Sequence, residues 1–370
     1  MICSNGNDIL AGMDAVADRA RKGRGAVSNA TGRYEPTQRI ATDDGWGSAD
    51  AELSPLRTTV GVDATRRIIT TNDSPDVPFD RSINPYRGCE HGCVYCFARP
   101  THAWLGLSPG LDFETRLFAK PNAAALLEAE LRHPRYRCRA IAMGTNTDPY
   151  QPVERSMGVT RGILEVLAAC DHPVTIVTKS ALVLRDIDIL APMAAKGLAQ
   201  VAISVTTLDR DLARRMEPRA ATPERRLDAI RALAAAGVPT GVLTAPVIPA
   251  LNDCELERIL EAAAAAGAGT AGYVLLRLPL EIEQLFEEWL SEHAPGRARH
   301  VMAIVREMRG GKAYDSRWGK RMRGTGVHAE LLSQRFALAV RRLGLGRRDW
   351  RLDTSRFRPP QKAGDQLRLL

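Results

Sequence analysis

The chain has 370 residues, of which 45% are hydrophobic and 25% are charged. This is the composition of an ordinary globular protein, and the length suits one large or two modest domains. No apolar stretch approaches the roughly 18 residues that cross a membrane, and no basic-then-apolar signal segment opens the chain. We therefore expect a cytoplasmic protein without membrane contact.

The net charge of +8 is unevenly distributed, because basic residues are concentrated in residues 296–370. Two interpretations stay open at this point. The cations could form a solvated helical surface, or they could contact a polyanion such as nucleic acid.

The N-terminal part of the chain divides into two regions. Residues 1–55 are rich in Gly, Ala, Asp and Arg without a sustained period, which predicts a mostly disordered segment. An α/β domain is expected over 56–295. Within it, 67–71 is a candidate edge strand, and 82–86 leads into a cysteine-rich loop as a first barrel strand would.

Three cysteines follow closely, with Cys89, Cys93 and Cys96 in the spacing C-x3-C-x2-C. Clustered thiolates select zinc or iron–sulfur clusters. Structural zinc usually takes four ligands in two pairs, and iron–sulfur clusters usually take four cysteines. Three cysteines in one loop therefore imply an iron–sulfur cluster with one iron left open, which suggests chemistry. The other four cysteines are scattered, so no disulfide framework is expected.

Short apolar and helical patterns alternate after this loop. Strands are predicted over 138–144, 174–178, 201–206, 238–247 and 273–278, and helices over 157–169, 183–195, 223–236 and 252–266. Strands that alternate with helices predict a parallel sheet. Together with the strand over 82–86 these make six strands, which predict an α/β fold, a partial (β/α)6 barrel, with ligands at the carboxyl ends of its strands.

The C-terminal region, 296–370, is predicted to be a helical, basic extension. Residues 281–343 are expected to be helical throughout, except for a break at 324–326 before a helix over 329–343. The tail, 347–370, is basic and interrupted by prolines, and we expect it to be loosely ordered.

The cysteine spacing, with Tyr95 before the third cysteine, resembles the signature of the radical S-adenosylmethionine superfamily. The resemblance implies a four-iron four-sulfur (4Fe–4S) cluster on the three cysteines and S-adenosylmethionine on the open iron. It also implies that Tyr95 is one of the residues that bind this cofactor. Reductive cleavage of that cofactor would yield a 5′-deoxyadenosyl radical that abstracts a hydrogen atom. The superfamily has the same six-fold partial barrel.

Further motifs are similar to the branch that contains spore photoproduct lyase and the DNA repair photolyase-like proteins. They are the run T-D-P-Y-Q-P-x-E over 147–154, T-K-S over 178–180 and E-P-R over 217–219. The resemblance extends from about Ile83 to Leu345. Two positions depart from the lyase. No cysteine occurs between Cys138 and Cys170, and a phenylalanine follows the third cluster cysteine where the lyase has tyrosine, so we do not predict dipyrimidine cleavage.

The resemblance implies roles for five polar residues at the strand ends. Thr145 and Asp148 would contact the methionine amino group, and Lys179 would complement the methionine carboxylate. Ser204 would contact the carboxylate or the ribose, and Arg219 would pair with a carboxylate. From the residues alone, these side chains could equally be turn formers, solvated cations or satisfied strand residues. No catalytic residue is assigned.

We therefore predict a lyase-like radical S-adenosylmethionine enzyme that receives electrons from a flavodoxin- or ferredoxin-like donor. Its substrate is unidentified. Nucleic acid is one candidate, because cations and Trp318 are interleaved in 317–323. The alternative is a non-catalytic nucleic-acid-binding protein stabilised by zinc or by a cluster. A zinc site would take His91 or His102 as its fourth ligand.

Overall fold

The computed structural model describes residues 18–38, 55–346 and 351–361. Its central element is a seven-stranded curved sheet of order β10-β9-β8-β7-β6-β3-β2. These strands are β10 (Thr270–Leu275), β9 (Thr240–Val247), β8 (Ala199–Ser204), β7 (Val174–Thr178), β6 (Ile141–Met143), β3 (Arg81–Ile83) and β2 (Thr70–Thr71). All neighbours are parallel except β2 and β3, which are antiparallel. The prediction of six parallel strands in chain order is confirmed, and β2 is the expected edge strand.

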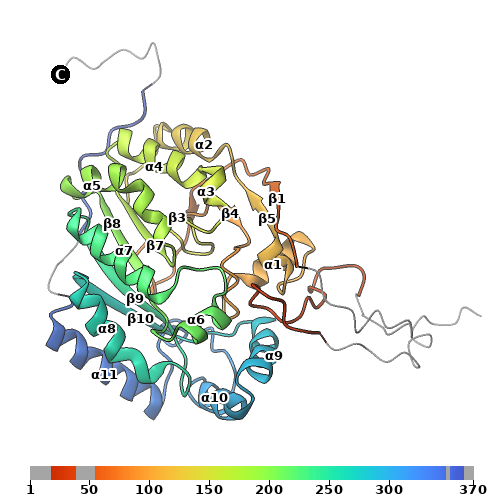
Figure 1. Cartoon of the computed structure of the whole chain (residues 1–370). Coiled ribbons are helices and arrows are strands. Elements are labelled where there is room, and N and C mark those ends of the chain that lie inside the picture. Colours follow the sequence, from red (N-terminus) through yellow and green to blue (C-terminus); the bar gives the residue numbers. More distant parts are fainter. Residues whose placement is uncertain (1–17, 39–54, 347–350, 362–370) are drawn as a thin grey trace, which may run out of the picture.

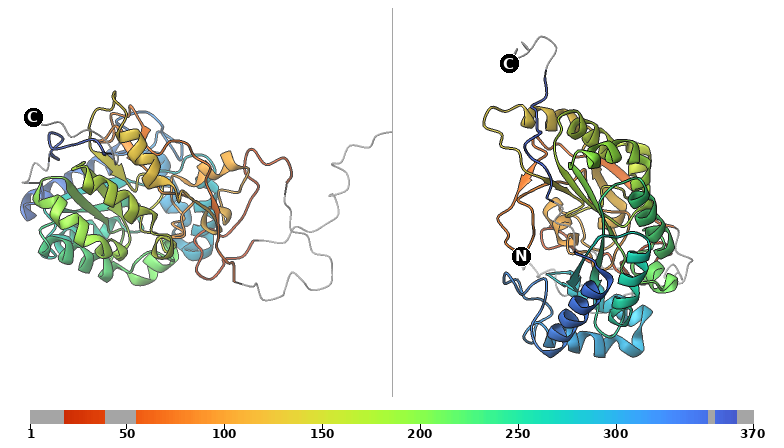
Figure 2. Two further views of the ribbon diagram at one scale, coloured as in Figure 1. Left: turned by 90° about the horizontal axis from the view of Figure 1, so that it is seen from above. Right: turned by 90° about the vertical axis from the view of Figure 1, so that its left-hand side faces the viewer.

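One helix follows each of the first five parallel strands, and these helices cover one face of the sheet (Figures 1 and 2). They are α2 (Ala123–Leu131), α4 (Val159–Ala169), α5 (Ile187–Ala195), α7 (Pro223–Ala235) and α8 (Leu256–Ala265). The predicted N-cap of α7 is present, because the Thr222 side chain accepts a hydrogen bond from the backbone of Arg225. After β10, α11 (Val327–Leu343) packs beside α8.

The opposite, concave face of the sheet stays partly accessible to solvent. Burial alternates along β7 and β8, where Ile176 and Ile203 are buried while Val177 and Ala202 are only partly buried. Val177 lies opposite Ala202 in the sheet register, so the two accessible side chains share one face. Gly241 of β9 lies opposite Ala202, so the middle of the concave face carries small residues. This face can therefore accept a ligand without displacing a packed core.

A second, three-stranded sheet supports the cysteine loop. Its order is β1-β5-β4, with β1 (Thr59–Val62), β5 (Arg116–Ala119) and β4 (Tyr86–Arg87). β4 ends two residues before Cys89, so backbone pairing with β5 anchors the start of the loop. The short helices are η2 (Arg99–Leu105), α1 (Asp112–Thr115), α3 (Glu154–Met157), η3 (Ala181–Asp186), α6 (Arg210–Met216) and η4 (Asp253–Glu255).

The N-terminal segment differs from its prediction. Residues 18–38 contain no helix or strand, as expected, but 24–28 are buried against the domain. Disorder is therefore the wrong prediction for that stretch. The composition of the segment could not predict this packing, because the packing depends on partners about ninety residues away in the sequence. The rest of the predicted disordered segment, 1–17 and 39–54, lies outside the described residues.

The C-terminal region also differs from continuous helix. It forms α9 (Ile282–His293), α10 (Pro295–Glu307) and α11, but 308–326 is a series of turns. Helix stops there because Gly310, Gly311, Gly319, Gly324 and Gly326 all adopt positive φ. In addition, α9 and α10 share one apolar cluster, so the expected boundary near residue 295 falls inside a packed helix pair.

The described part of the tail, 351–361, is packed rather than loosely ordered. It runs past the ends of α2, α4 and α5 (Figure 1). The backbone N–H of Asp353 donates to the Gly197 carbonyl at 2.9 Å, and Phe357 packs against His172 with ring centroids 5.2 Å apart. These contacts place the tail at the amino ends of the strands, opposite the cysteine loop. Residues 347–350 and 362–370 of the predicted tail lie outside the described residues.

Candidate active site

The three cysteine side chains lie together at the carboxyl end of the barrel. Cys89 and Cys93 are buried and Cys96 is partly buried. Burial raises the pKa of the Cys89 thiol, and the neighbouring Asp148, Cys93 and Cys96 raise it further. The loop therefore concentrates negative charge once its thiols ionise, which a cationic metal cluster would stabilise.

The donor set suits a multi-iron cluster better than a single ion. Within the described ranges, no three His, Cys, Asp or Glu side chains surround one metal-ion position. In a 4Fe–4S cluster each cysteine binds a different iron, so the thiols need not meet at one point. Three thiols on one short loop, two of them buried and one partly buried, fit that arrangement.

Two buried side chains fix the backbone of the loop. Arg99, which is fully buried, donates to the carbonyls of Cys93 and Gly92 and pairs with the Glu114 carboxylate. Gln151 accepts a hydrogen bond from the Glu90 backbone at 2.9 Å and donates to the Gly88 carbonyl at 3.2 Å. No sequence motif predicted a role for Arg99, Glu114 or Gln151. A clue to Gln151 was its position inside the 147–154 motif.

The N-terminal segment also supports the cysteine loop, through Glu114. The backbone N–H groups of Gly25 and Ala26 donate to the Glu114 carboxylate at 2.9 and 2.8 Å. A Cβ added at Gly25 would lie 1.7 Å from the carbonyl oxygen of Gly92. The segment and the cysteine loop are thus in direct backbone contact at a position where only glycine fits.

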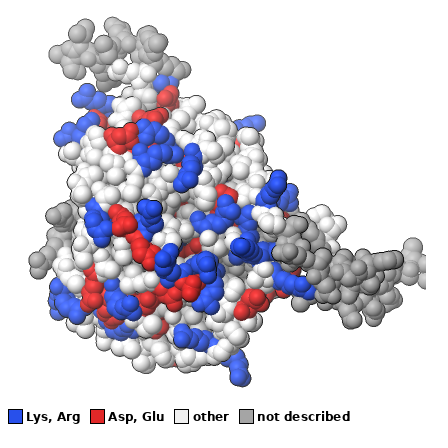
Figure 3. Space-filling view, viewed as in Figure 1, with Lys and Arg blue, Asp and Glu red and all other residues white. Residues whose placement is uncertain are grey.

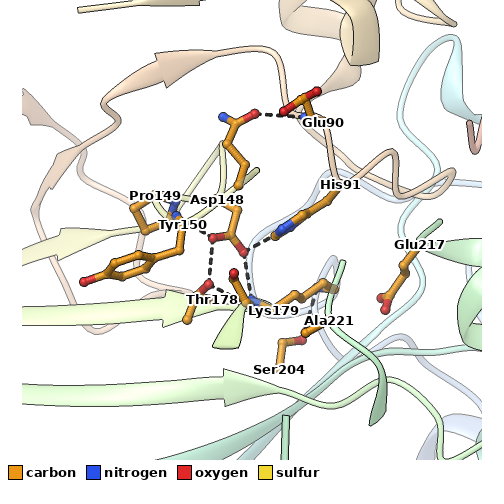
Figure 4. Close-up of polar contacts among 12 residues, drawn as sticks. Glu90, His91, Asp148, Pro149, Tyr150, Thr178, Lys179, Ser204, Glu217 and Ala221 are labelled. Carbon is orange, nitrogen blue, oxygen red and sulfur yellow. Dashed lines mark hydrogen bonds and ion pairs between the residues drawn. The ribbon is translucent and has the colours of Figure 1, made fainter. Parts of the chain in front are cut away.

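Asp148 orders the strand ends around the loop (Figure 4). Its carboxylate accepts hydrogen bonds from the Thr178 hydroxyl at 2.6 Å and the Lys179 backbone at 2.8 Å, and it pairs with His91 at 3.3 Å. Burial alone would raise the pKa of Asp148, but His91 and the hydrogen bonds outweigh it and lower the pKa to about 2. Both carboxylate oxygens of Asp148 therefore already have partners within this chain. Thr145, the other predicted amino-group contact, shares hydrogen bonds with Asn84 at 3.2 and 3.3 Å.

Three of the predicted cofactor contacts converge. The Lys179 ammonium donates to the Ser204 hydroxyl at 3.1 Å and lies 5.8 Å from the centre of the Tyr95 ring. Lys179 follows β7 and Ser204 ends β8, so both stand at the carboxyl ends of adjacent strands. A cation, a hydroxyl and an aromatic ring next to the cysteines can receive a carboxylate and a planar base.

Glu217 lies beside this group, although its sequence context did not predict a role for it. Its buried carboxylate accepts hydrogen bonds from the Tyr95 phenol and from Thr206, and it pairs with Arg226. Burial raises the pKa of Glu217, and Arg226 opposes that shift. Arg226 also donates to the Ser204 carbonyl at 3.1 Å. One polar network therefore joins the cysteine loop to the end of β8.

Arg219, a predicted carboxylate contact, pairs with a carboxylate of this chain. Its guanidinium lies 3.1 Å from Glu90, and its backbone N–H donates to the His91 carbonyl at 3.3 Å. The E-P-R segment over 217–219 is thereby fastened to the cysteine loop. The side chain is partly exposed, so a role in ligand binding stays a prediction.

The two histidines proposed as zinc ligands have other partners. His91 pairs with Asp148 through Nδ1. His102 is fully buried, its Nε2 bonds the Arg116 carbonyl at 2.9 Å, and its ring packs on Phe113. The other ring nitrogen of His102, Nδ1, is buried without a hydrogen-bond partner in the described part of the chain.

Several cations of the C-terminal region are neutralised within the chain. The ion pairs are Arg317–Asp315, Arg321–Asp76, Arg335–Glu257 and Arg342–Glu261. Figure 3 shows basic and acidic side chains interspersed over the face that it displays. Trp318 is 55% exposed, and Arg347, Arg348 and Trp350 lie outside the described residues. None of the described helices is long and apolar enough to cross a membrane.

Comparison with known proteins identifies a family domain in the middle of the chain. Residues 83–263 match the model of the Radical SAM superfamily, in which SAM is S-adenosylmethionine. This part of the chain is therefore a Radical SAM domain, and the matched region runs from β3 into α8.

Two relatives from other organisms are similar in sequence to part of this chain. An uncharacterized protein of Mycobacterium tuberculosis is 42% identical over 221 residues, which are 59% of this chain and 65% of the relative. An uncharacterized protein of Methanocaldococcus jannaschii is 30% identical over 173 residues, 47% of this chain and 62% of the relative. The chain thus spans less than two thirds of the length of each of these relatives.

The fold is also similar to that of spore photoproduct lyase. The structure of that lyase complexed with dinucleoside spore photoproduct aligns with a TM-score of 0.56 at 17% identity. The alignment covers 77% of this chain and 80% of the lyase chain. At this identity the likeness establishes a common fold, so the barrel of this chain is of the same type.

Proposed function

We propose that this protein is a radical S-adenosylmethionine enzyme. Cys89, Cys93 and Cys96 hold a 4Fe–4S cluster, and S-adenosylmethionine occupies the adjacent barrel mouth. When bound, the two cofactors supply reductive cleavage of S-adenosylmethionine and hydrogen-atom abstraction from a substrate. The observation that carries this proposal is the loop of three thiols at the carboxyl end of the partial barrel, beside Lys179 and Ser204.

The side chains at the mouth fit the polar groups of S-adenosylmethionine. Lys179 supplies a cation for the methionine carboxylate, and Ser204 supplies a hydroxyl next to it. Tyr95 lies beside Lys179 and offers an aromatic surface. Asp148 contributes indirectly, because it accepts a hydrogen bond from the backbone of Lys179. Thr145, which follows β6, contacts the methionine amino group.

Anaerobic reconstitution with iron and sulfide tests the proposal. The reduced protein should show the electron paramagnetic resonance signal of a 4Fe–4S cluster and should convert S-adenosylmethionine to 5′-deoxyadenosine. Cys93→Ala should abolish both. Cys254→Ala is the matched control, because Cys254 is exposed outside the loop, and it should retain both. A wild-type protein that binds zinc, or yields no more 5′-deoxyadenosine than Cys93→Ala, would reject the proposal.

We also propose an electron donor and a candidate substrate class for this enzyme. The reductant is a low-potential flavodoxin- or ferredoxin-like protein, and a reducing cytoplasm suits the cluster. The enzyme belongs to the photoproduct-lyase-like branch of the superfamily, and nucleic acid is its candidate substrate. Its support is the basic composition of 296–370. Fluorescence anisotropy with labelled DNA should show binding that weakens steeply with salt and weakens in Arg347→Gln/Arg348→Gln.

A further inference from the structure

Arg277 is a partly buried cation without a carboxylate partner. It follows β10 at the rim of the barrel, and among the described residues no acidic side chain lies within ion-pair distance of it. Within the described part of the chain, its guanidinium donates one hydrogen bond, to the Met322 sulfur at 3.3 Å. Burial is the main cause that lowers the pKa of Arg277. Burying a charge without a partner is costly, so this position calls for a counter-ion.

The surroundings of Arg277 add to the positive charge. Arg309 is buried and donates to two carbonyls, those of Lys320 at 2.8 Å and Leu276 at 2.7 Å, which leave its charge uncompensated. Arg321 lies within electrostatic reach of Arg277, but its charge is balanced by Asp76. Three guanidinium groups thus share one neighbourhood with two carboxylates, Asp76 and Asp315, and each of these already pairs with an arginine other than Arg277 and Arg309.

This cationic neighbourhood adjoins the cysteine loop. The guanidinium of Arg277 stacks 4.2 Å from the centre of the Phe97 ring, and Phe97 directly follows Cys96. Phe97 is 42% exposed, so the stacked pair is open to solvent. Stacking on an aromatic ring fixes the guanidinium plane and leaves its edge free to donate to a planar or tetrahedral oxyanion.

We propose that Arg277, held on Phe97 at the barrel rim, binds an oxyanion carried by the substrate, either a phosphate or a carboxylate. The inference rests on the proposed function, because it names a group on the molecule that this enzyme acts on. The site lies beside the third cysteine and is separate from the Lys179–Ser204 pair that faces the cofactor. It therefore selects substrates by a charge placed next to their reacting carbon.

Binding can be measured without catalysis. The full-length protein, without S-adenosylmethionine, is titrated by calorimetry with inorganic phosphate and separately with acetate. At least one should bind, and Arg277→Met should weaken that binding at least tenfold. Arg277→Lys keeps the charge but loses the planar fork, so its loss should be smaller. Arg299→Met, an exposed arginine on α10, is the control and should match wild type.

The results distinguish a phosphate from a carboxylate as the bound group. They also test the anion site independently of the proposed enzymatic activity. Tighter phosphate binding assigns a phosphorylated substrate, and tighter acetate binding assigns a carboxylate. Crystals soaked in selenate should show an anomalous peak at Arg277. Equal binding by wild type and Arg277→Met, or no binding of either anion, would overturn the inference. These experiments measure binding and not turnover. A protein that makes no 5′-deoxyadenosine can therefore still bind the anion at Arg277, and an active enzyme can still lack this anion site.

Discussion

Arg226 forms an ion pair with Glu217, and both side chains are almost completely buried next to the cysteine loop. Arg226 comes from α7, whereas Glu217 follows α6. Through Tyr95 on one side and the Ser204 carbonyl on the other, the pair ties the loop to the barrel. A buried pair of this kind positions its neighbours while balancing charge near the three cysteines.

Glu217→Gln should destabilise the protein, because it leaves the Arg226 cation buried without its partner. Loss of one member of a buried pair typically costs about 3–5 kcal/mol. Urea unfolding of the cluster-free protein measures this loss. Glu224→Gln, at an exposed ion pair, should cost under about 1 kcal/mol. The double variant Glu217→Gln/Arg226→Met should recover part of the stability, and its failure to do so would argue against the pair as the cause.

Lys179→Met should weaken the binding of S-adenosylmethionine. A charge-assisted hydrogen bond contributes about 1.5–3 kcal/mol, which corresponds to roughly 10- to 100-fold in affinity. Equilibrium dialysis on reconstituted, unreduced protein gives the dissociation constant. Lys196→Met removes a surface cation that pairs with Asp171 at the other end of the barrel, and it should bind normally. Equal affinity in both variants would place Lys179 outside the cofactor site.

Gly25→Ala should displace the N-terminal segment from the cysteine loop. The added methyl group would overlap the Gly92 carbonyl, which belongs to backbone and cannot simply rotate away. Hydrogen exchange of 88–96 should speed up, and the reconstituted cluster should be lost faster in air. Gly296→Ala, where an added Cβ meets nothing within 4 Å, is the control. Unchanged exchange in Gly25→Ala would show that the segment does not support the loop.

His172 should make the protein less stable in mild acid. Burial lowers the pKa of His172 to about 4, against 6.5 for the free side chain. Between these values the unfolded chain binds a proton that the folded chain does not, so stability falls as pH decreases from 6.5 to 4. The full loss is about 3 kcal/mol.

Thermal unfolding followed between pH 7.5 and 4 measures this dependence. His172→Gln should flatten the curve between pH 6.5 and 4, whereas His300→Gln, at an exposed position, should leave it unchanged. Identical slopes in wild type and His172→Gln would exclude His172 as the source.

Local patterns predicted much of the fold because their causes are local. β-branched runs such as 174–178 form strands in any parallel sheet, and Thr222 followed by proline starts a helix by hydrogen bonding its own backbone. The cysteine spacing likewise predicted a shared site, since eight residues of chain cannot separate the thiols far. These features required no knowledge of distant partners.

Tertiary structure decided which polar residues meet. Glu114 is held by residues near position 25, Asp148 by the end of β7, and Arg277 by Phe97 in the cysteine loop. Each of these contacts joins segments from about thirty to one hundred and eighty residues apart, so no sequence window contains both partners. The sequence by itself determined the barrel and its three thiols, because backbone preference and short spacing act locally. Only folding decided the charge pairs around them, because a buried charge is stabilised by whichever distant group the packing brings to it.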